Sequence, residues 1–307
     1  IKHAYGSRNT YFHILTMEEK VKKKYKNRIE KIKNRFLLAF GVFLCCFPTI
    51  SSICLQKEQD SLVQTYTSDV QSLSKEELNR MYKDAQTYNQ TLYATQGSSL
   101  ANVDYSQLSE ENYKKQLCVT ASGIMANIEI PCIDVSLPIY HGTDDDALNN
   151  GVGHLKESSL PVGGKSTRSI LTGHRGLPTA KLFTRLDELE KSDLFYIHVC
   201  NKTLAYKIMK IEIIRPEELN KLDIEEGKDL VTLVTCTPYG INTKRLIVTG
   251  ERIPYNKTTK QSIKKKNLSI RECTFILLPL LLMFMIFILL VVIKRKNRKE
   301  KNPNVQS

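Results

Sequence analysis

The pattern of apolar and polar positions divides the chain into segments of three kinds. Residues 36–55 and 274–293 contain no charged side chain, and an α-helix of about 20 residues spans about 30 Å, the thickness of a hydrocarbon core. Residues 56–122 place apolar side chains at helical spacing in a polar background, which predicts a helical extension. Residues 123–255 change to short runs of β-forming residues, which predicts a mainly β domain.

Cap and breaker residues indicate where helices of the extension begin and end. Ser74 followed by Glu76 and Glu77 is typical of a helix start. Residues 97–99, Gly-Ser-Ser, interrupt the helical pattern, and a second short helix is expected from residue 109 to residue 117. The extension is therefore expected to contain at least two helices.

The β domain is a series of short apolar runs separated by turn residues. Many short strands with few helices between them predict an antiparallel sandwich or barrel. The runs cover residues 124–131, 135–142, 168–174, 194–199, 203–214, 229–236 and 245–253. One helix is expected among them, at residues 178–191, because its apolar side chains recur at helical spacing. These side chains are Leu182, Phe183, Leu186 and Leu189.

The formal net charge of +13 lies in the two ends of the chain. Residues 1–35 carry a net charge of +8 and residues 294–307 carry +5, so the part between them is net neutral. This distribution argues against a nucleic-acid-binding face and indicates two basic tails beside membrane spans. Because Lys and Arg stay on the cytoplasmic side of a membrane, both termini are expected in the cytoplasm and residues 56–273 outside it.

The segment boundaries follow from this topology. Residues 36–55 are expected to form a transmembrane helix or an uncleaved signal anchor, because the run is longer than the apolar part of a usual signal peptide. Residues 256–273 are expected to be a linker, and residues 274–293 a second transmembrane helix. Met17 opens a plausible natural beginning, so residues 1–16 are expected to be upstream sequence.

Among the eight cysteines, Cys236 has a distinct setting. It ends an apolar run just before a turn that contains Pro-Tyr-Gly, and Arg245 opens the next run. If these two residues face each other across a hairpin, Val234 and Ile247 share their face of the sheet. A packed structural thiol and a reactive thiol are both compatible with this local sequence.

His174 ends an apolar run and precedes a turn, the same setting as that of Cys236. An imidazole and a thiol at neighbouring strand ends can activate one another for nucleophilic attack. Sequence spacing alone does not place the two side chains together. Three other histidines of the β domain are expected to have structural roles, His141 and His154 in loops and His198 in a strand.

The motifs around these residues resemble those of the sortase family. Residues 171–183, LTGHRGLPTAKLF, and residues 232–252, TLVTCTPYGINTKRLIVTGER, match a pattern in which TLxTC is followed several residues later by Arg. The resemblance covers about residues 123–255. It implies a closed, mainly β barrel of about eight strands with short helices.

This resemblance also implies an activity, that of a cysteine transpeptidase. Cys236 would be the nucleophile, His174 the general acid/base, and Arg245 the group that stabilises the transition state. Thr235 would help to bind the substrate or line the oxyanion site. No cofactor and no metal are implied.

The helical extension and the second apolar run are similar to those of class C sortases, which polymerise pilins. Such enzymes carry a lid with an Asp-Pro-aromatic motif, and this chain has Asp104 and Tyr105 in about the corresponding place, without the Pro. By resemblance Asp104 would pair with Arg245 and Tyr105 would cover Cys236. An ordinary helix N-terminus with a capping Asp or Ser is the alternative interpretation of this segment.

The implied substrate is an LPxTG-like sorting signal, cleaved between Thr and Gly and joined to a Lys amine of another pilin subunit. The implied location is the membrane of a Gram-positive cell, with membrane lipid as a neighbour and no nucleic acid as a partner. One alternative is a sortase that attaches surface proteins to peptidoglycan. Another is a non-catalytic, membrane-anchored assembly scaffold in which Cys236 is only packed. A papain-like peptidase fits less well, because its cysteine lies at a helix N-terminus.

Overall fold

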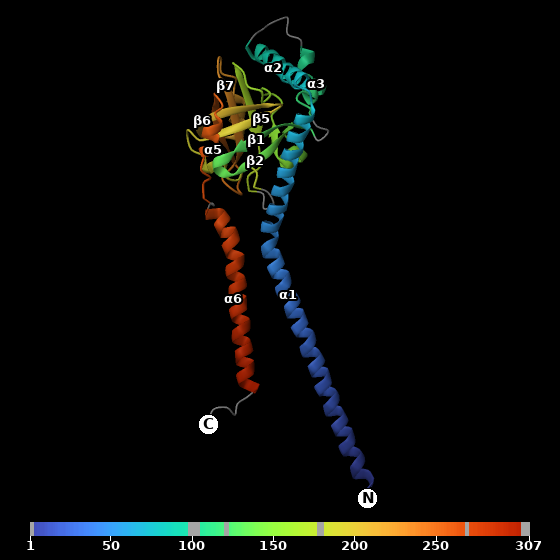
Figure 1. Cartoon of the computed structure of the whole chain (residues 1–307). Helices are drawn as coiled ribbons and strands as arrows, with labels where there is room; N and C mark the ends of the chain where they lie inside the picture. Colours follow the sequence, from blue (N-terminus) through green and yellow to red (C-terminus); the bar gives the residue numbers. More distant parts are fainter. Residues whose placement is uncertain (1–2, 98–104, 120–122, 177–180, 268–269, 302–307) are drawn as a thin grey trace. The chain divides into compact units, whose positions relative to one another are not determined.

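The computed structural model describes residues 3–97, 105–119, 123–176, 181–267 and 270–301. The chain divides into two compact units, Ile1–Ile50 with Arg271–Ser307, and Ser51–Ile270 (Figure 1). The second unit contains most of the helical extension and the whole β domain. The candidate catalytic residues therefore belong to the second unit.

The first unit contains the apolar helical segments. Helix α1 (His3–Ser72) begins in this unit, and helix α6 (Ile270–Lys301) makes up its other part. In the described part of the chain, one helix is long and apolar enough to cross a membrane, over Val21–Ser72. The apolar stretch of α6, Leu277–Ile293, is shorter. The first expected span is thus compatible with the structure, and the second stays a prediction.

Two helices of the extension, α2 and α3, begin at cap residues as predicted. At the start of α2, the Ser74 hydroxyl accepts a hydrogen bond from the Glu77 amide at 3.1 Å, and the Ser74 amide donates to the Glu77 carboxylate at 3.0 Å. Ser109 caps α3 by accepting from the Asn112 amide at 3.3 Å. These bonds satisfy amides that have no partner inside the helix. After α1 the elements are α2 (Lys75–Gly97), the 3-10 turn η1 (Tyr105–Leu108) and α3 (Glu110–Lys115).

Buried polar side chains fasten this extension to the β domain. The Tyr66 hydroxyl of α1 donates to the Met125 carbonyl at 3.1 Å. Asn89 of α2 accepts from the Leu160 amide at 2.7 Å and donates to the Leu160 carbonyl at 3.0 Å. A buried polar group left without a partner costs about 1–3 kcal/mol. The two sets of bonds therefore favour one placement of the helices on the barrel.

Eight strands close into a barrel in the order β1-β2-β3-β4-β7-β8-β6-β5. The strands are β1 (Ile124–Ile130), β2 (Val135–His141), β3 (Val152–His154), β4 (Thr167–Thr172), β5 (Leu194–Val199), β6 (Lys202–Ile214), β7 (Asp229–Thr237) and β8 (Lys244–Ile253). The remaining helical elements are η2 (Pro131–Ile133), α4 (Asp145–Asn150), η3 (Leu186–Glu188), η4 (Pro216–Lys221) and α5 (Lys257–Ser262). The expected closed barrel of about eight strands is confirmed. Only β3 was not predicted, because three residues are too few to show an alternating pattern.

Two strand pairs are parallel, β2 with β3 and β4 with β7. The prediction of an antiparallel sheet is wrong for these pairs and correct for the other pairs of the barrel. Strands β5 and β6 lie between β4 and β7 in the sequence, so local patterning does not reveal their pairing. Because parallel strands run in the same direction, the ends of β4 and β7 meet at one rim of the barrel.

The helix predicted at residues 178–191 does not form in its described part. Its residues up to 180 lie outside the described residues, and from 181 to 191 the only helical element is the three-residue turn η3. Leu182 has a φ of +32°, which a right-handed helix does not accommodate. The predicted apolar stripe is nevertheless buried, Phe183 completely so. An irregular loop therefore buries these side chains without forming a helix.

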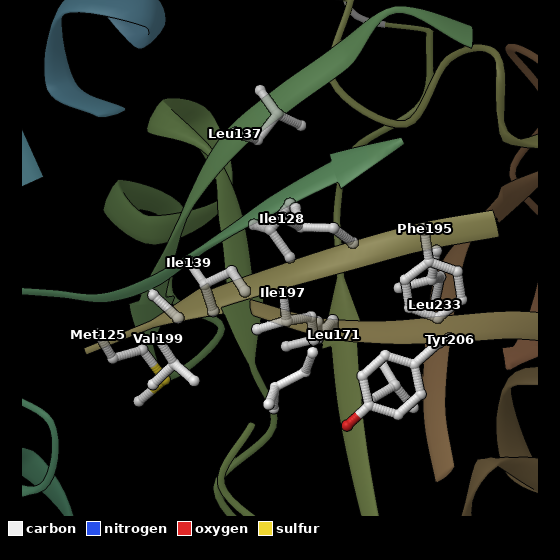
Figure 2. Packing of buried hydrophobic residues seen from close by; sticks show 14 of the residues in the cluster. Met125, Ile128, Leu137, Ile139, Leu171, Phe195, Ile197, Val199, Tyr206 and Leu233 are labelled. Atoms are coloured by element: carbon white, nitrogen blue, oxygen red, sulfur yellow. The ribbon is translucent and has the colours of Figure 1, made fainter. Parts of the chain in front are cut away.

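Alternate residues of the strands point into the barrel and form one apolar core, part of which Figure 2 shows. Phe195 and Tyr206 stack with their ring centroids 5.4 Å apart. A Cβ at Gly250 would lie 2.4 Å from the Phe195 ring, so β8 needs a glycine at this position. The packed core therefore holds the strand ends at the rim of the barrel in fixed positions.

His154 lies inside β3 and is fully buried, in contrast to the predicted loop position. Its Nε2 lies 2.8 Å from the Ser159 carbonyl, which can only accept, so Nε2 carries the proton. Its Nδ1 then accepts from the Tyr113 hydroxyl of α3 at 2.9 Å. Burial lowers the pKa of His154 from 6.5 to about 4. The neutral imidazole therefore joins α3 to the barrel.

Acidification is expected to destabilise the barrel through His154. Because the folded-state pKa is lowered to about 4, the stabilising contribution is complete above about pH 6.5 and is lost as the pH falls towards 4; it is on the order of 3 kcal/mol. Urea unfolding at about pH 7.5 and about pH 4.5 should show a smaller acid loss of unfolding free energy for His154→Asn than for the wild type. Equal losses in the two proteins would contradict this role.

Candidate active site

Strands β7 and β8 form a hairpin whose register sets Cys236 opposite Arg245. Val234 and Ile247 pair two residues further along and share the same face of the sheet. The sequence analysis stated this register only as a condition, and the structure shows that the condition is met. Cys236 is the last residue but one of β7, so its thiol lies where the strand meets the turn.

The end of β4 carries His174 to the same rim. Thr172 lies beside Val234 in the parallel ladder, and the Gly173 amide extends this ladder by donating to the Val234 carbonyl at 3.1 Å. In this register the residue after Gly173, His174, comes beside Cys236. The parallel pair therefore supplies the juxtaposition that sequence spacing could not establish.

Burial alternates along both strand ends. His174 and Cys236 are half-buried, whereas the residue on either side of each is buried. The buried neighbours are Gly173, Arg175, Thr235 and Thr237. Because successive side chains of an extended chain point to opposite faces, the imidazole and the thiol share the outer face of the rim. Arg245 is half-buried as well and belongs to the same face by its pairing with Cys236.

The Arg245 guanidinium bonds only to main-chain carbonyls among the described residues. One of its nitrogens donates to the carbonyls of Asn242 and Lys244, each at 3.1 Å. These bonds hold the side chain against the β7–β8 turn and leave its positive charge without a carboxylate partner within the described part of the chain. A fixed, uncompensated guanidinium beside a nucleophile can stabilise an oxyanion.

On the outer face of the sheet, the side chains nearest Cys236 are apolar, and those further from the rim are polar. Val234 and Ile247 are buried there although they point away from the barrel core. Further from the rim, the buried Arg168 of β4 donates to the Thr232 hydroxyl at 3.1 Å and to the Glu225 carboxylate at 2.6 Å. Glu225 belongs to the connection between β6 and β7, so this arginine ties that connection to the sheet. Nothing in the local sequence indicated this ion pair.

Thr235 was expected to bind substrate or line the oxyanion site. Its hydroxyl donates to the Gly173 carbonyl at 2.7 Å, and the residue is almost completely buried. The observed contact holds the loop that carries His174. The expected contact of Thr235 with substrate stays a prediction.

The lid residues are only partly described. Asp104 lies outside the described residues, and Tyr105 begins the turn η1. The pairing of Asp104 with Arg245 and the covering of Cys236 by Tyr105 therefore stay predictions.

His198 has the structural role that was expected of it. Both of its ring nitrogens have hydrogen-bonding partners within strands, Glu129 at 2.8 Å and Thr203 at 3.1 Å.

Two neighbours of the rim, Arg175 and Tyr239, could not be predicted from the sequence. Arg175 donates to the Thr237 hydroxyl at 3.1 Å and pairs with Asp187 at 2.5 Å. The Tyr239 ring lies so close to Gly176 that a Cβ there would come within 3.3 Å of it. Arg175 is adjacent to His174 in the motif, but nothing in the sequence indicates its partners. The structure thus adds a second layer of contacts beneath the reactive side chains.

Comparison with known proteins agrees with this geometry. A family model described as Sortase domain matches residues 128–253. Sortase D of Bacillus subtilis (strain 168) is 36% identical over 136 residues, which are 43% of this chain and 64% of that protein. Clostridium perfringens sortase C, solved with the C-terminal cell wall sorting motif, is 41% identical with a TM-score of 0.54, and the match covers 64% of this chain and 99% of that one. Streptococcus pneumoniae sortase C, whose structure is described in terms of catalysis and pilin substrate specificity, is 39% identical with a TM-score of 0.56, covering 64% of this chain and 97% of that one.

The barrel, the rim and these similarities define the class of protein. The chain belongs to the sortase family. The two solved neighbours are class C sortases, in agreement with the class expected from the helical extension and the second apolar run, and the chain is accordingly a sortase-type cysteine transpeptidase.

Proposed function

We propose that this chain polymerises pilins: it cleaves an LPxTG-like sorting signal between Thr and Gly and joins the new acyl group to a Lys amine of another pilin subunit. The observation that carries the proposal is the meeting of two strand ends, where the parallel pair β4–β7 brings His174 beside Cys236 and the hairpin sets Arg245 opposite. The cell wall sorting motif in the Clostridium perfringens structure and the pilin specificity named for the Streptococcus pneumoniae enzyme support the substrate class.

The first half of the reaction forms a thioester. The Cys236 thiolate attacks the carbonyl carbon of the Thr residue, and the electron pair of the C=O bond moves to the oxygen. The Arg245 guanidinium stabilises the oxyanion. As the Thr–Gly bond breaks, the His174 imidazolium gives its proton to the leaving Gly amine. The Cys236 sulfur is then acylated and His174 is neutral.

The second half transfers the acyl group to the acceptor. A Lys amine attacks the thioester carbon and loses a proton to neutral His174. The new C–N bond is an isopeptide bond, and rupture of the C–S bond restores the Cys236 thiolate. The charges of the thiolate and the imidazolium are the same at the end as at the start, so no cofactor is needed for the balance.

A membrane location follows from the same proposal. The basic segments 1–35 and 294–307 would lie in the cytoplasm, the apolar segments 36–55 and 274–293 in the membrane, and the barrel outside it. The long apolar helix over Val21–Ser72 supports the first anchor. Substrates that emerge from the same membrane would then reach the barrel rim, and residues 256–273 would connect barrel and second anchor.

The proposal is tested by locating the acyl group on the protein. After incubation of the full chain in detergent with an LPxTG-like peptide, digestion and mass spectrometry should find the peptide acyl group on the fragment that contains Cys236. Addition of a Lys-containing pilin peptide should release it as an isopeptide product. Release only by a peptidoglycan-type amine would favour cell-wall attachment instead, and an acyl group on another cysteine would refute the assignment.

A further inference from the structure

The neighbours of Cys236 and the neighbours of His174 are bonded to each other in pairs. Thr235, which precedes Cys236, donates to the carbonyl of Gly173, which precedes His174, at 2.7 Å. Arg175, which follows His174, donates to the hydroxyl of Thr237, which follows Cys236, at 3.1 Å. The two reactive residues are therefore bracketed on both sides by hydrogen bonds made on the buried face of the rim.

Arg175 is a buried charge that is held in a fixed orientation. Its side chain is only 5% exposed, and one terminal nitrogen pairs with the Asp187 carboxylate of η3 at 2.5 Å. The other terminal nitrogen binds Thr237. Because the guanidinium is planar, its contact with Asp187 orients the nitrogen that faces Thr237. The ion pair thus aligns the hydrogen bond beside Cys236.

His174 needs such support because it lies beyond the strand. β4 ends at Thr172, and the last ladder bond to β7 is made by Gly173. After that point the loop is held on its other side by the Phe183 amide, which donates to the His174 carbonyl at 3.1 Å. The Arg175–Thr237 bond links this loop to the end of β7. It therefore ties the residue that follows His174 to the residue that follows Cys236.

We propose that Arg175 is a positioning residue which, oriented by Asp187, holds Thr237 and so keeps Cys236 and His174 in reacting geometry. This inference rests on the proposed function. The Arg175 side chain is buried beneath the rim, whereas the thiol and the imidazole lie on its outer face, so its removal should slow the chemical step and leave substrate binding nearly unchanged. A displacement of about 1 Å between reacting groups can lower a rate about 100-fold.

The decisive pair of variants is Thr237→Val and Thr237→Ser. Valine has nearly the shape of threonine but cannot accept the Arg175 hydrogen bond, whereas serine keeps the hydroxyl. In a peptide-cleavage assay with the full chain, Thr237→Val should lower kcat about tenfold with KM changed less than about twofold. Thr237→Ser should retain kcat within about twofold. Arg175→Lys, which keeps a charge near Asp187 but loses the planar fork, should fall in kcat like Thr237→Val.

A matched control separates positioning from general stability. Thr167, at the start of β4, is also buried and donates its hydroxyl to the Gly164 carbonyl at 2.7 Å. It is seven residues before His174, about 23 Å along an extended strand. Thr167→Val should lower the Tm without lowering kcat. The same loss of kcat in Thr167→Val and Thr237→Val would overturn the inference.

The outcomes also separate this inference from the proposed function. Wild-type kcat in Thr237→Val, with thioester formation intact in the wild type, would overturn the positioning role of Arg175 and leave the assignment of Cys236 standing. A wild-type chain that forms no thioester on Cys236 would overturn both. A tenfold loss in Thr237→Val that Thr237→Ser does not share supports the inference.

Discussion

Cys236→Ala is expected to abolish thioester formation with an LPxTG-like peptide and to leave the barrel folded. The thiol lies at the end of β7, on the outer face of the rim and outside the packed core, so its replacement by a hydrogen atom removes no core contact. Without the sulfur there is no nucleophile, so the acyl intermediate cannot form. Mass spectrometry of the protein after incubation with the peptide measures the loss.

The control for this variant is another accessible cysteine. Cys118 is exposed and, like all eight cysteines in the described part of the chain, it is not in a disulfide. Cys118→Ala should form the thioester at the wild-type rate. Thioester formation that persists in Cys236→Ala and disappears in Cys118→Ala would show that the nucleophile has been assigned to the wrong residue.

Arg245→Met is expected to lower kcat about 100- to 1,000-fold, the range found when one group that stabilises an oxyanion is removed. The charge acts chiefly in the transition state, so KM for the peptide should change little. Arg245→Lys should recover only part of the rate, because an ammonium group lacks the planar fork of donors. Steady-state kinetics of peptide cleavage measures both values.

This variant needs a control for the turn. Since the Arg245 guanidinium also bonds the carbonyls of Asn242 and Lys244, its loss can loosen the β7–β8 connection. Lys244→Ala changes the neighbouring exposed residue of β8 and should leave kcat within about twofold of the wild type. A kcat of Arg245→Met within about twofold of the wild type would contradict the role in the transition state.

The part of the site that lies on the β7–β8 hairpin was easier to predict from the sequence than the position of His174. Cys236 and Arg245 belong to adjacent strands joined by one turn, so a register in which they face each other could be considered from the local sequence. His174 follows the end of β4, and β4 pairs in parallel with β7 although two strands separate them in the sequence. Local patterns carry no information on such a contact, and only the family resemblance linked the two residues.

The failed helix at residues 178–191 has a related cause. The spacing of its apolar side chains reflected burial, which the structure confirms, but burial does not require a helix. Arg175 and Asp187 were unpredictable for a different reason. Both look like surface charges in the sequence, and their pairing at the rim depends on how the loop after β4 folds back.

The parallel junction between β4 and β7 also sets when the enzyme can begin to work. Because β5 and β6 lie between the two strands in the sequence, His174 and Cys236 are 62 residues apart, and β7 must be synthesised before their side chains can meet. A half-assembled polypeptide would carry an inert sulfur far from any imidazole. Activity would then appear only after the strand that carries the sulfur has paired with β4.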